Sequence, residues 1–101
     1  MLGMMSRSTM TAPGNENVLD VQLHAHALER LLERGASADE VIRTVQEGET
    51  FPAKFGRSGF RRNFPFGGNW RGRRYGTKQV EAIAVREGDT WLVLTVLVKF
   101  F

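Results

Sequence analysis

Residues 50 to 80 combine the two kinds of side chain that bind single-stranded nucleic acid. This segment has eight basic residues and no acidic one, although the whole chain has a formal net charge of only +3. Seven of the chain's aromatic residues also lie there. Guanidinium groups neutralise phosphates, and aromatic rings stack on unpaired bases. We therefore expect one contiguous cationic surface that binds RNA. The candidate contact residues are Arg57, Arg61, Arg62, Arg71, Arg73, Arg74 and Lys78.

Other interpretations of this segment stay open. Aromatic side chains are typical of a hydrophobic core, so the rings can fill the interior while the arginines stay hydrated. An acidic protein would satisfy the same positive charges as RNA. The adjacent pairs Arg61/Arg62 and Arg73/Arg74 add a second ambiguity, because neighbouring residues of a strand face opposite sides. Only one member of each pair can then face a substrate, and the sequence does not say which.

Three residues are candidates for acid–base chemistry on a bound RNA. Cleavage without a metal needs a base for the 2′-hydroxyl, cations on the phosphorane and an acid for the leaving oxygen. His26 is the first candidate, since imidazole titrates near neutral pH and Arg30 follows one helical turn later. Glu81, inside an apolar strand, is a candidate base, and Tyr75 is a candidate acid. The alternatives are a packing role for His26 and a solvated position for Glu81.

Composition limits the other possibilities. A chain of 101 residues with 42% hydrophobic residues supports one packed domain. The absence of cysteine excludes disulfides, cysteine-based zinc sites and thiol nucleophiles. The longest apolar run, residues 91 to 98, is far shorter than a membrane span, and we find no secretory signal. We expect a cytoplasmic protein that uses no cofactor and no metal.

The first half of the chain predicts a leader and two helices. Residues 1 to 17 lack an apolar period and are predicted to be a flexible leader, within which Met4, Met5 or Met10 is an alternative start. The domain is expected to span residues 18 to 101. The predicted elements are a helix from Asp20 to Arg34 that Gly35 ends, and a second helix that Ser37 and Glu40 cap and Gly48 ends.

The second half predicts strands. Residues 60 to 66 form a strand with Pro65 at an edge, and a loop over residues 67 to 69 leads to residues 70 to 75. Residues 78 to 86 alternate as a strand should, and the turn over residues 87 to 90 leads to a central strand over residues 91 to 100. The expected fold class is α+β, with a helical pair on an antiparallel sheet of about four strands.

Two parts of the chain resemble a bacterial domain family of unknown function. The family pattern has His-Ala, then Arg, then Glu-Arg-Gly-Ile-Ser, which residues 26 to 37 match with Ala36 in place of Ile. An acidic helix containing Val follows at residues 39 to 42, and a closing hairpin with a Val-x-Lys-aromatic end matches residues 80 to 101. The resemblance covers about residues 22 to 101. The family is similar to the RelE/ParE-like toxins.

This resemblance implies a RelE-like fold and, with it, a function. It implies a metal-independent endoribonuclease, or an RNA-binding toxin, of a toxin–antitoxin pair. The partners would be RNA, including ribosome-bound mRNA, and an acidic antitoxin protein. The superfamily also contains gyrase-directed toxins and members without known activity, so the fold leaves the target open. The alternative is a non-catalytic module that binds nucleic acid or an acidic protein.

Overall fold

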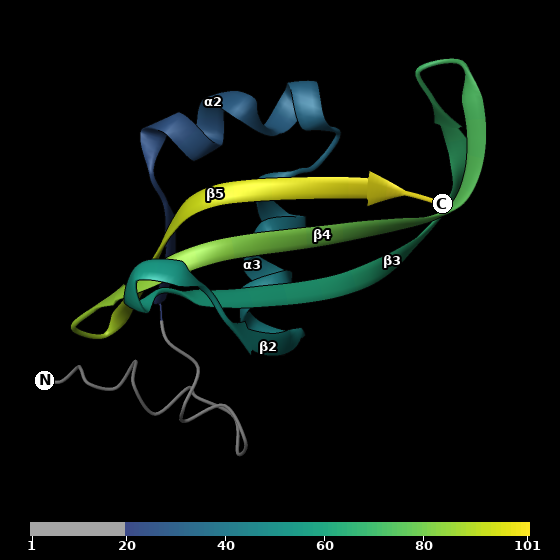
Figure 1. The fold of residues 1–101 in the computed structure, drawn as a ribbon. Helices are drawn as coiled ribbons and strands as arrows, with labels where there is room; N and C mark the ends of the chain where they lie inside the picture. The colour runs from purple at the N-terminus through teal and green to yellow at the C-terminus, as the bar shows by residue number, and fades with distance from the viewer. Residues whose placement is uncertain (1–19) are drawn as a thin grey trace, which may run out of the picture.

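The computed structural model describes residues 20–101, so the leader predicted for residues 1–17 lies outside the described residues. The fold is α+β, with two helices packed on a mixed five-stranded sheet whose strand order is β1-β5-β4-β3-β2 (Figure 1). The elements in chain order are β1 (Asp20–Leu23), α2 (Ala25–Arg34), α3 (Ala38–Glu47), β2 (Glu49–Pro52), the 3-10 turn η1 (Lys54–Gly56), β3 (Ser58–Trp70), β4 (Arg73–Glu87) and β5 (Thr90–Phe100).

The sheet differs from the prediction of about four antiparallel strands. The residues expected to start the first helix form β1, which pairs in parallel with the first part of β5. Val21 and Leu23 alternate toward the core, a period of two that the longer helical pattern masked. The helix therefore starts later, and the side chain of His24 caps it by accepting a hydrogen bond from the backbone N–H of His26.

Two further differences concern β2 and β3. The residues that follow α3 form the edge strand β2, which pairs antiparallel with the start of β3. The predicted loop over residues 67 to 69 is part of β3, which continues to Trp70 across a register shift between Pro65 and Gly68. A β-bulge bends a strand and raises its twist without ending the pairing. The Gly-rich sequence is therefore compatible with a bulged strand as well as with a loop.

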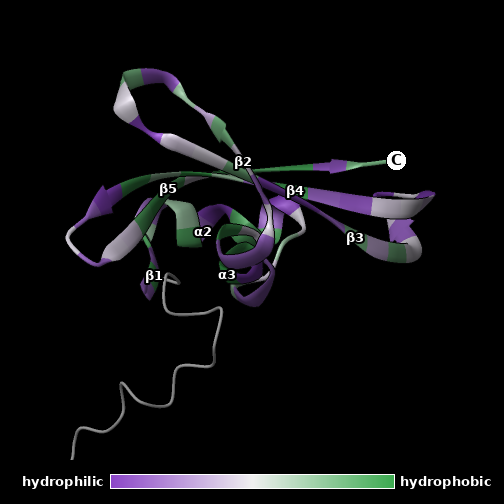
Figure 2. Cartoon of the chain, turned by 90° about the horizontal axis from the view of Figure 1, so that it is seen from below, coloured by the Kyte–Doolittle hydropathy of each residue, from purple (hydrophilic) through white to green (hydrophobic). Residues whose placement is uncertain are grey.

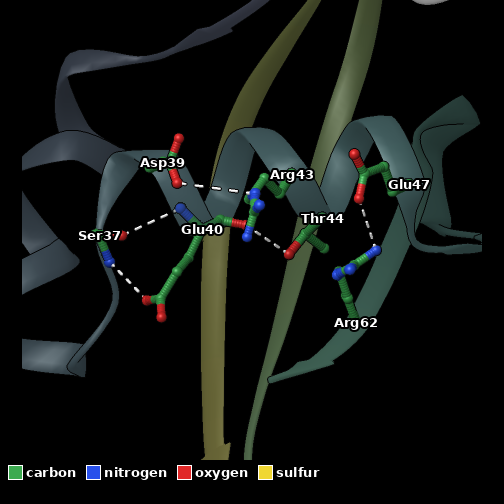
Figure 3. Close-up of polar contacts among 7 residues, drawn as sticks. All are labelled: Ser37, Asp39, Glu40, Arg43, Thr44, Glu47 and Arg62. Carbon is green, nitrogen blue, oxygen red and sulfur yellow. Dashed lines mark hydrogen bonds and ion pairs between the residues drawn. The ribbon is translucent and has the colours of Figure 1, made fainter. Parts of the chain in front are cut away.

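The end of α2 and both ends of α3 are as predicted. Gly35 ends α2 in the left-handed conformation, with φ 83°. A complete capping box starts α3, because the side chain of Ser37 accepts from the N–H of Glu40 and the carboxylate of Glu40 accepts from the N–H of Ser37 (Figure 3). The turn between these caps is short, but the two helices pack on different strands and not mainly on each other.

The core lies between the helices and one face of the sheet. The inward residues of β4 are Val80, Ala82 and Ala84, all fully buried. Their small side chains let α3 approach β4 and β3, while α2 packs mainly on β5. Both helices lie on this face, and no helix of residues 20–101 covers the other (Figure 2).

The far end of the β3–β4 hairpin is held against the turn between the helices. The hairpin extends past the end of β5 and bends toward α2 (Figure 1). Trp70 stacks on Phe100 with a centroid distance of 5.0 Å. A Cβ on Gly35 would lie 2.9 Å from Cη2 of Trp70, closer than real Cβ contacts allow. Gly35 therefore serves both the backbone turn and the approach of the indole.

Gly35→Ala tests this double role, with Gly72→Ala as the matched control. Both glycines have a φ near +84°, but a Cβ on Gly72 has nothing within 4 Å. We expect Gly72→Ala to lower the free energy of unfolding by about 1 kcal/mol, the cost of a left-handed alanine. We expect Gly35→Ala to cost about 1–3 kcal/mol more, because Trp70 and Phe100 must move. Equal losses in denaturant unfolding would show that the indole contact contributes nothing.

Candidate nucleic-acid interface

Lys78, a predicted phosphate ligand, is instead a buried structural residue. The residue is only 9% exposed. Its amine lies 2.9 Å from a carboxylate oxygen of Glu40 and donates to the carbonyl of Gly35 at 2.8 Å. The carboxylate that caps α3 therefore also neutralises this lysine. The contact joins β4 to the turn between the helices and leaves the amine unavailable to a ligand.

Arg61 and Arg62 face opposite sides of the sheet, as expected for neighbours on a strand, and both form ion pairs. On the uncovered face, Arg61 lies 3.2 Å from Glu81 and 3.3 Å from Glu49, and its guanidinium stacks 4.5 Å from the ring centroid of Phe51. On the helical side, Arg62 lies 3.0 Å from Glu47 at the end of α3 (Figure 3). These carboxylates neutralise the middle of the basic segment.

The tip of the β3–β4 hairpin retains unneutralised positive charge. Arg71, Arg73 and Arg74 are exposed there, and none has an ion-pair partner among residues 20–101. Arg71 sits at the turn with φ 51° and donates to the backbone carbonyl of Glu33 at 2.7 Å, which leaves its charge uncompensated. We call these three residues the arginine tip.

Arg57 belongs to a second cationic site, at the opposite end of β3. The loop from Ala53 to Arg57 is closed by two backbone hydrogen bonds: the N–H of Ala53 donates to the carbonyl of Arg57, and the N–H of Arg57 donates to the carbonyl of Lys54. Within it Phe55 is 86% exposed and adopts φ 61°, a left-handed conformation that is rare for a bulky residue. Lys54 is exposed beside Phe55, and the guanidinium of Arg57 lies 5.7 Å from the ring centroid of Phe55. We call residues 53 to 57 the Phe55 loop.

The expectation of one contiguous cationic surface is wrong. β3 has 13 residues, and at roughly 3.3 Å per residue it separates the Phe55 loop from the arginine tip by about 40 Å. The basic side chains between these two ends, Arg61, Arg62 and Lys78, form ion pairs with carboxylates. Composition alone missed Phe55 and Lys54 as a site, and the Lys-Phe-Gly sequence followed by Arg is the signal that was available.

The three candidate catalytic residues do not come together. Glu81 points to the uncovered face, where Arg61 binds it. His26 lies on α2, on the other side of the sheet, beside a cavity of about 80 Å³ that Arg30 and Arg34 also line. Tyr75 lies at the hairpin tip, 5.6 Å from the ring centroid of Phe100. A base, an acid and a phosphate ligand from this set cannot reach one scissile bond in this arrangement.

No family model, no curated protein and no solved structure matches this chain. Among residues 20–101, we find no group of three or more histidine and carboxylate side chains that could hold a metal ion. Within the same residues, neither helix has the length and apolar character needed to cross a membrane.

Lys78→Met tests the structural role of the buried amine, because methionine keeps the apolar stem and removes only the charge. We expect the free energy of unfolding to fall by about 3 kcal/mol, the cost of breaking one partner out of a buried pair. The control Lys54→Met removes an exposed lysine and should change it by no more than about 0.5 kcal/mol. If Lys78→Met were as stable as the parent but bound RNA more weakly, Lys78 would be a ligand after all.

Proposed function

We propose that this chain is a single-stranded RNA-binding module without an assembled catalytic site. The observation that supports it is the arginine tip, where three guanidinium groups within four residues lack a carboxylate partner in the described part of the chain. Guanidinium groups form two parallel hydrogen bonds to a phosphate, which makes arginine a good phosphate ligand. All three arginines are exposed, which makes the tip accessible to a strand of RNA.

The Phe55 loop supports the same function by a different interaction. An exposed ring can stack on any unpaired base, and the closed loop that carries it lowers the conformational entropy lost on binding. Lys54 and Arg57 flank it and supply charge for the adjoining phosphates. Two anchor points at opposite ends of β3 favour an extended strand of RNA over a compact ligand.

A RelE-like fold and a toxin role are part of this proposal. In their favour, a helical pair precedes three long antiparallel strands, as the resemblance implied, although the parallel strand β1 was not expected. RNA binding at the two ends of the sheet would let the protein act on free or ribosome-bound mRNA without cleaving it. Because His26, Glu81 and Tyr75 lie apart, we favour binding over endoribonuclease activity.

The double variant Arg73→Ala/Arg74→Ala tests the arginine tip. Binding of a fluorescent single-stranded RNA should depend on salt with a log–log slope of roughly −0.7 per neutralised phosphate, so the variant should flatten the slope by about 1.4. The control Arg43→Ala/Arg86→Ala removes the same charge from other surfaces and should keep the slope. An identical slope in both variants would mean that only net charge matters and would contradict the assignment.

Phe55→Ala tests the stacking contact at the other end. Loss of one stacked base costs about 1–3 kcal/mol, or roughly a 5- to 150-fold loss of RNA affinity. The control Leu32→Ala removes another large apolar side chain, one that is 89% exposed on α2, and should leave the affinity unchanged. If an end-labelled RNA were also cut by the parent protein, and the cutting were lost in His26→Ala, the non-catalytic proposal would be wrong.

A further inference from the structure

Part of β5 forms an unpaired edge of the sheet. β1 pairs with β5 only from Thr90 to Val93, after which the chain turns into α2, whereas β5 continues to Phe100. From Leu94 onward, no strand of residues 20–101 lies on this side of β5. An edge of this kind displays unpaired N–H and C=O groups and is a template for another strand.

The hydrogen bonds of the ladder show which groups point outward. Phe101 and Thr77 exchange both backbone hydrogen bonds, which makes them a bonded pair. Because bonded and non-bonded pairs alternate along an antiparallel ladder, Val96, Val98 and Phe100 direct their backbone groups away from β4. The outward carbonyl of Val96 confirms this, since it accepts a hydrogen bond from the guanidinium of Arg34.

The same edge runs beside a cationic cavity. This cavity of about 410 Å³ is lined by Glu33, Arg34, Trp70, Arg71, Leu97 and Val98. The side chain of Arg34 is half-buried, and neither it nor Arg71 has a carboxylate within 4.0 Å in the described part of the chain. Glu33 does not neutralise them, because its carboxylate binds Arg30 at 2.7 Å. Two uncompensated guanidinium groups therefore face one cavity next to free backbone groups.

The opposite edge of the sheet is built differently. β2 ends in Pro52, and β3 carries Pro65 beyond the end of β2. Proline has no N–H and discourages the addition of another strand. The edge of β5 from residue 95 to 100 has no proline. Of its outward backbone groups, the carbonyl of Val96 accepts a hydrogen bond from Arg34. The sheet is thus protected at one edge and open to pairing at the other.

We propose that the free edge of β5 binds an extended acidic segment of a partner protein as an added strand. The segment pairs with Val96, Val98 and Phe100 over about five residues, which corresponds to roughly 17 Å. A backbone N–H of the segment replaces Arg34 as the hydrogen-bond donor to the carbonyl of Val96, so the guanidinium of Arg34 is released. The released guanidinium and that of Arg71 then bind carboxylates of the segment in the cavity.

Several observations favour this occupant over RNA or a second copy of the chain. The edge offers alternating donors and acceptors at the spacing of a strand, a pattern that a peptide backbone matches and a ribose-phosphate chain does not. Trp70 stacks on Phe100 and lies 5.0 Å from the guanidinium of Arg71, so it is already engaged within the protein. A second copy would bring the same uncompensated arginines against each other. The proposal shares only Arg71 with the arginine tip. The edge of β5 and Arg34 belong to the peptide site alone, so their tests separate it from RNA binding at the arginine tip and the Phe55 loop.

The test uses capped eight-residue Val/Thr peptides with two Glu residues at varied positions, and a matched set with Lys in place of Glu. We expect an acidic peptide to bind, no Lys peptide to bind, and N-methylation of the bound peptide's backbone to abolish binding. In the complex, hydrogen exchange of the Val98 and Phe100 amides should slow by at least about tenfold. Arg34→Gln should weaken the binding by about tenfold, the loss expected for one charge-assisted hydrogen bond, while Arg73→Ala/Arg74→Ala should not.

Each other result would overturn the proposal. One is that no acidic peptide binds at millimolar concentration, and another is that binding leaves the Val98 and Phe100 amides unchanged. A third is that single-stranded RNA slows the same amides, which would make the cavity part of the nucleic-acid site. The last is slow exchange of these amides in the protein alone. If this protection increased with protein concentration, a second copy of the chain would occupy the edge. If it did not depend on concentration, residues 1–19 would occupy it.

Discussion

The amine of Lys78 is the contact on which the arrangement of the other elements depends. A buried ammonium group is costly unless a carboxylate and further acceptors surround it. Here Glu40 and the carbonyl of Gly35 meet it, and the ring of Phe66 lies 5.5 Å away. These partners come from the start of α3, the end of α2 and β3, so one side chain of β4 sets how the helical pair sits on the sheet. The contact of Gly35 with Trp70 then places the hairpin tip, and the tip lines one side of the cavity beside β5.

The same principle divides the basic segment into structural and available cations. Arg61, Arg62 and Lys78 lie where β3 and β4 cross the body of the domain, and each meets a carboxylate there. The available cations lie where the chain leaves the body, at the Phe55 loop and the arginine tip. Charge that no carboxylate compensates keeps its attraction for an anionic partner, whereas ion-paired charge does not.

The sequence predicted local features better than long-range ones. The capping box, the Gly35 stop and the alternation of residues 78 to 86 are local signals, and all three are present. Which basic residues would be ion-paired was not predictable, because their carboxylate partners lie outside the basic segment and reach it only when separate elements pack or pair. These partners are Glu40, Glu47, Glu49 and Glu81. The strand β1 was missed because its residues also fit a helical pattern. The exposure of Phe55 was missed because the sequence does not reveal the positive φ that this residue adopts.

The most direct test of this division is a nuclear magnetic resonance titration with a single-stranded RNA, observing the arginine Nε and lysine Nζ groups as well as the backbone amides. Our account predicts that the signals of Arg57, Arg71, Arg73, Arg74 and the Phe55 loop shift with RNA, while those of Arg61, Arg62 and the Lys78 amine stay in place. Shifts centred on Lys78 and Arg61, with a silent hairpin tip, would contradict it.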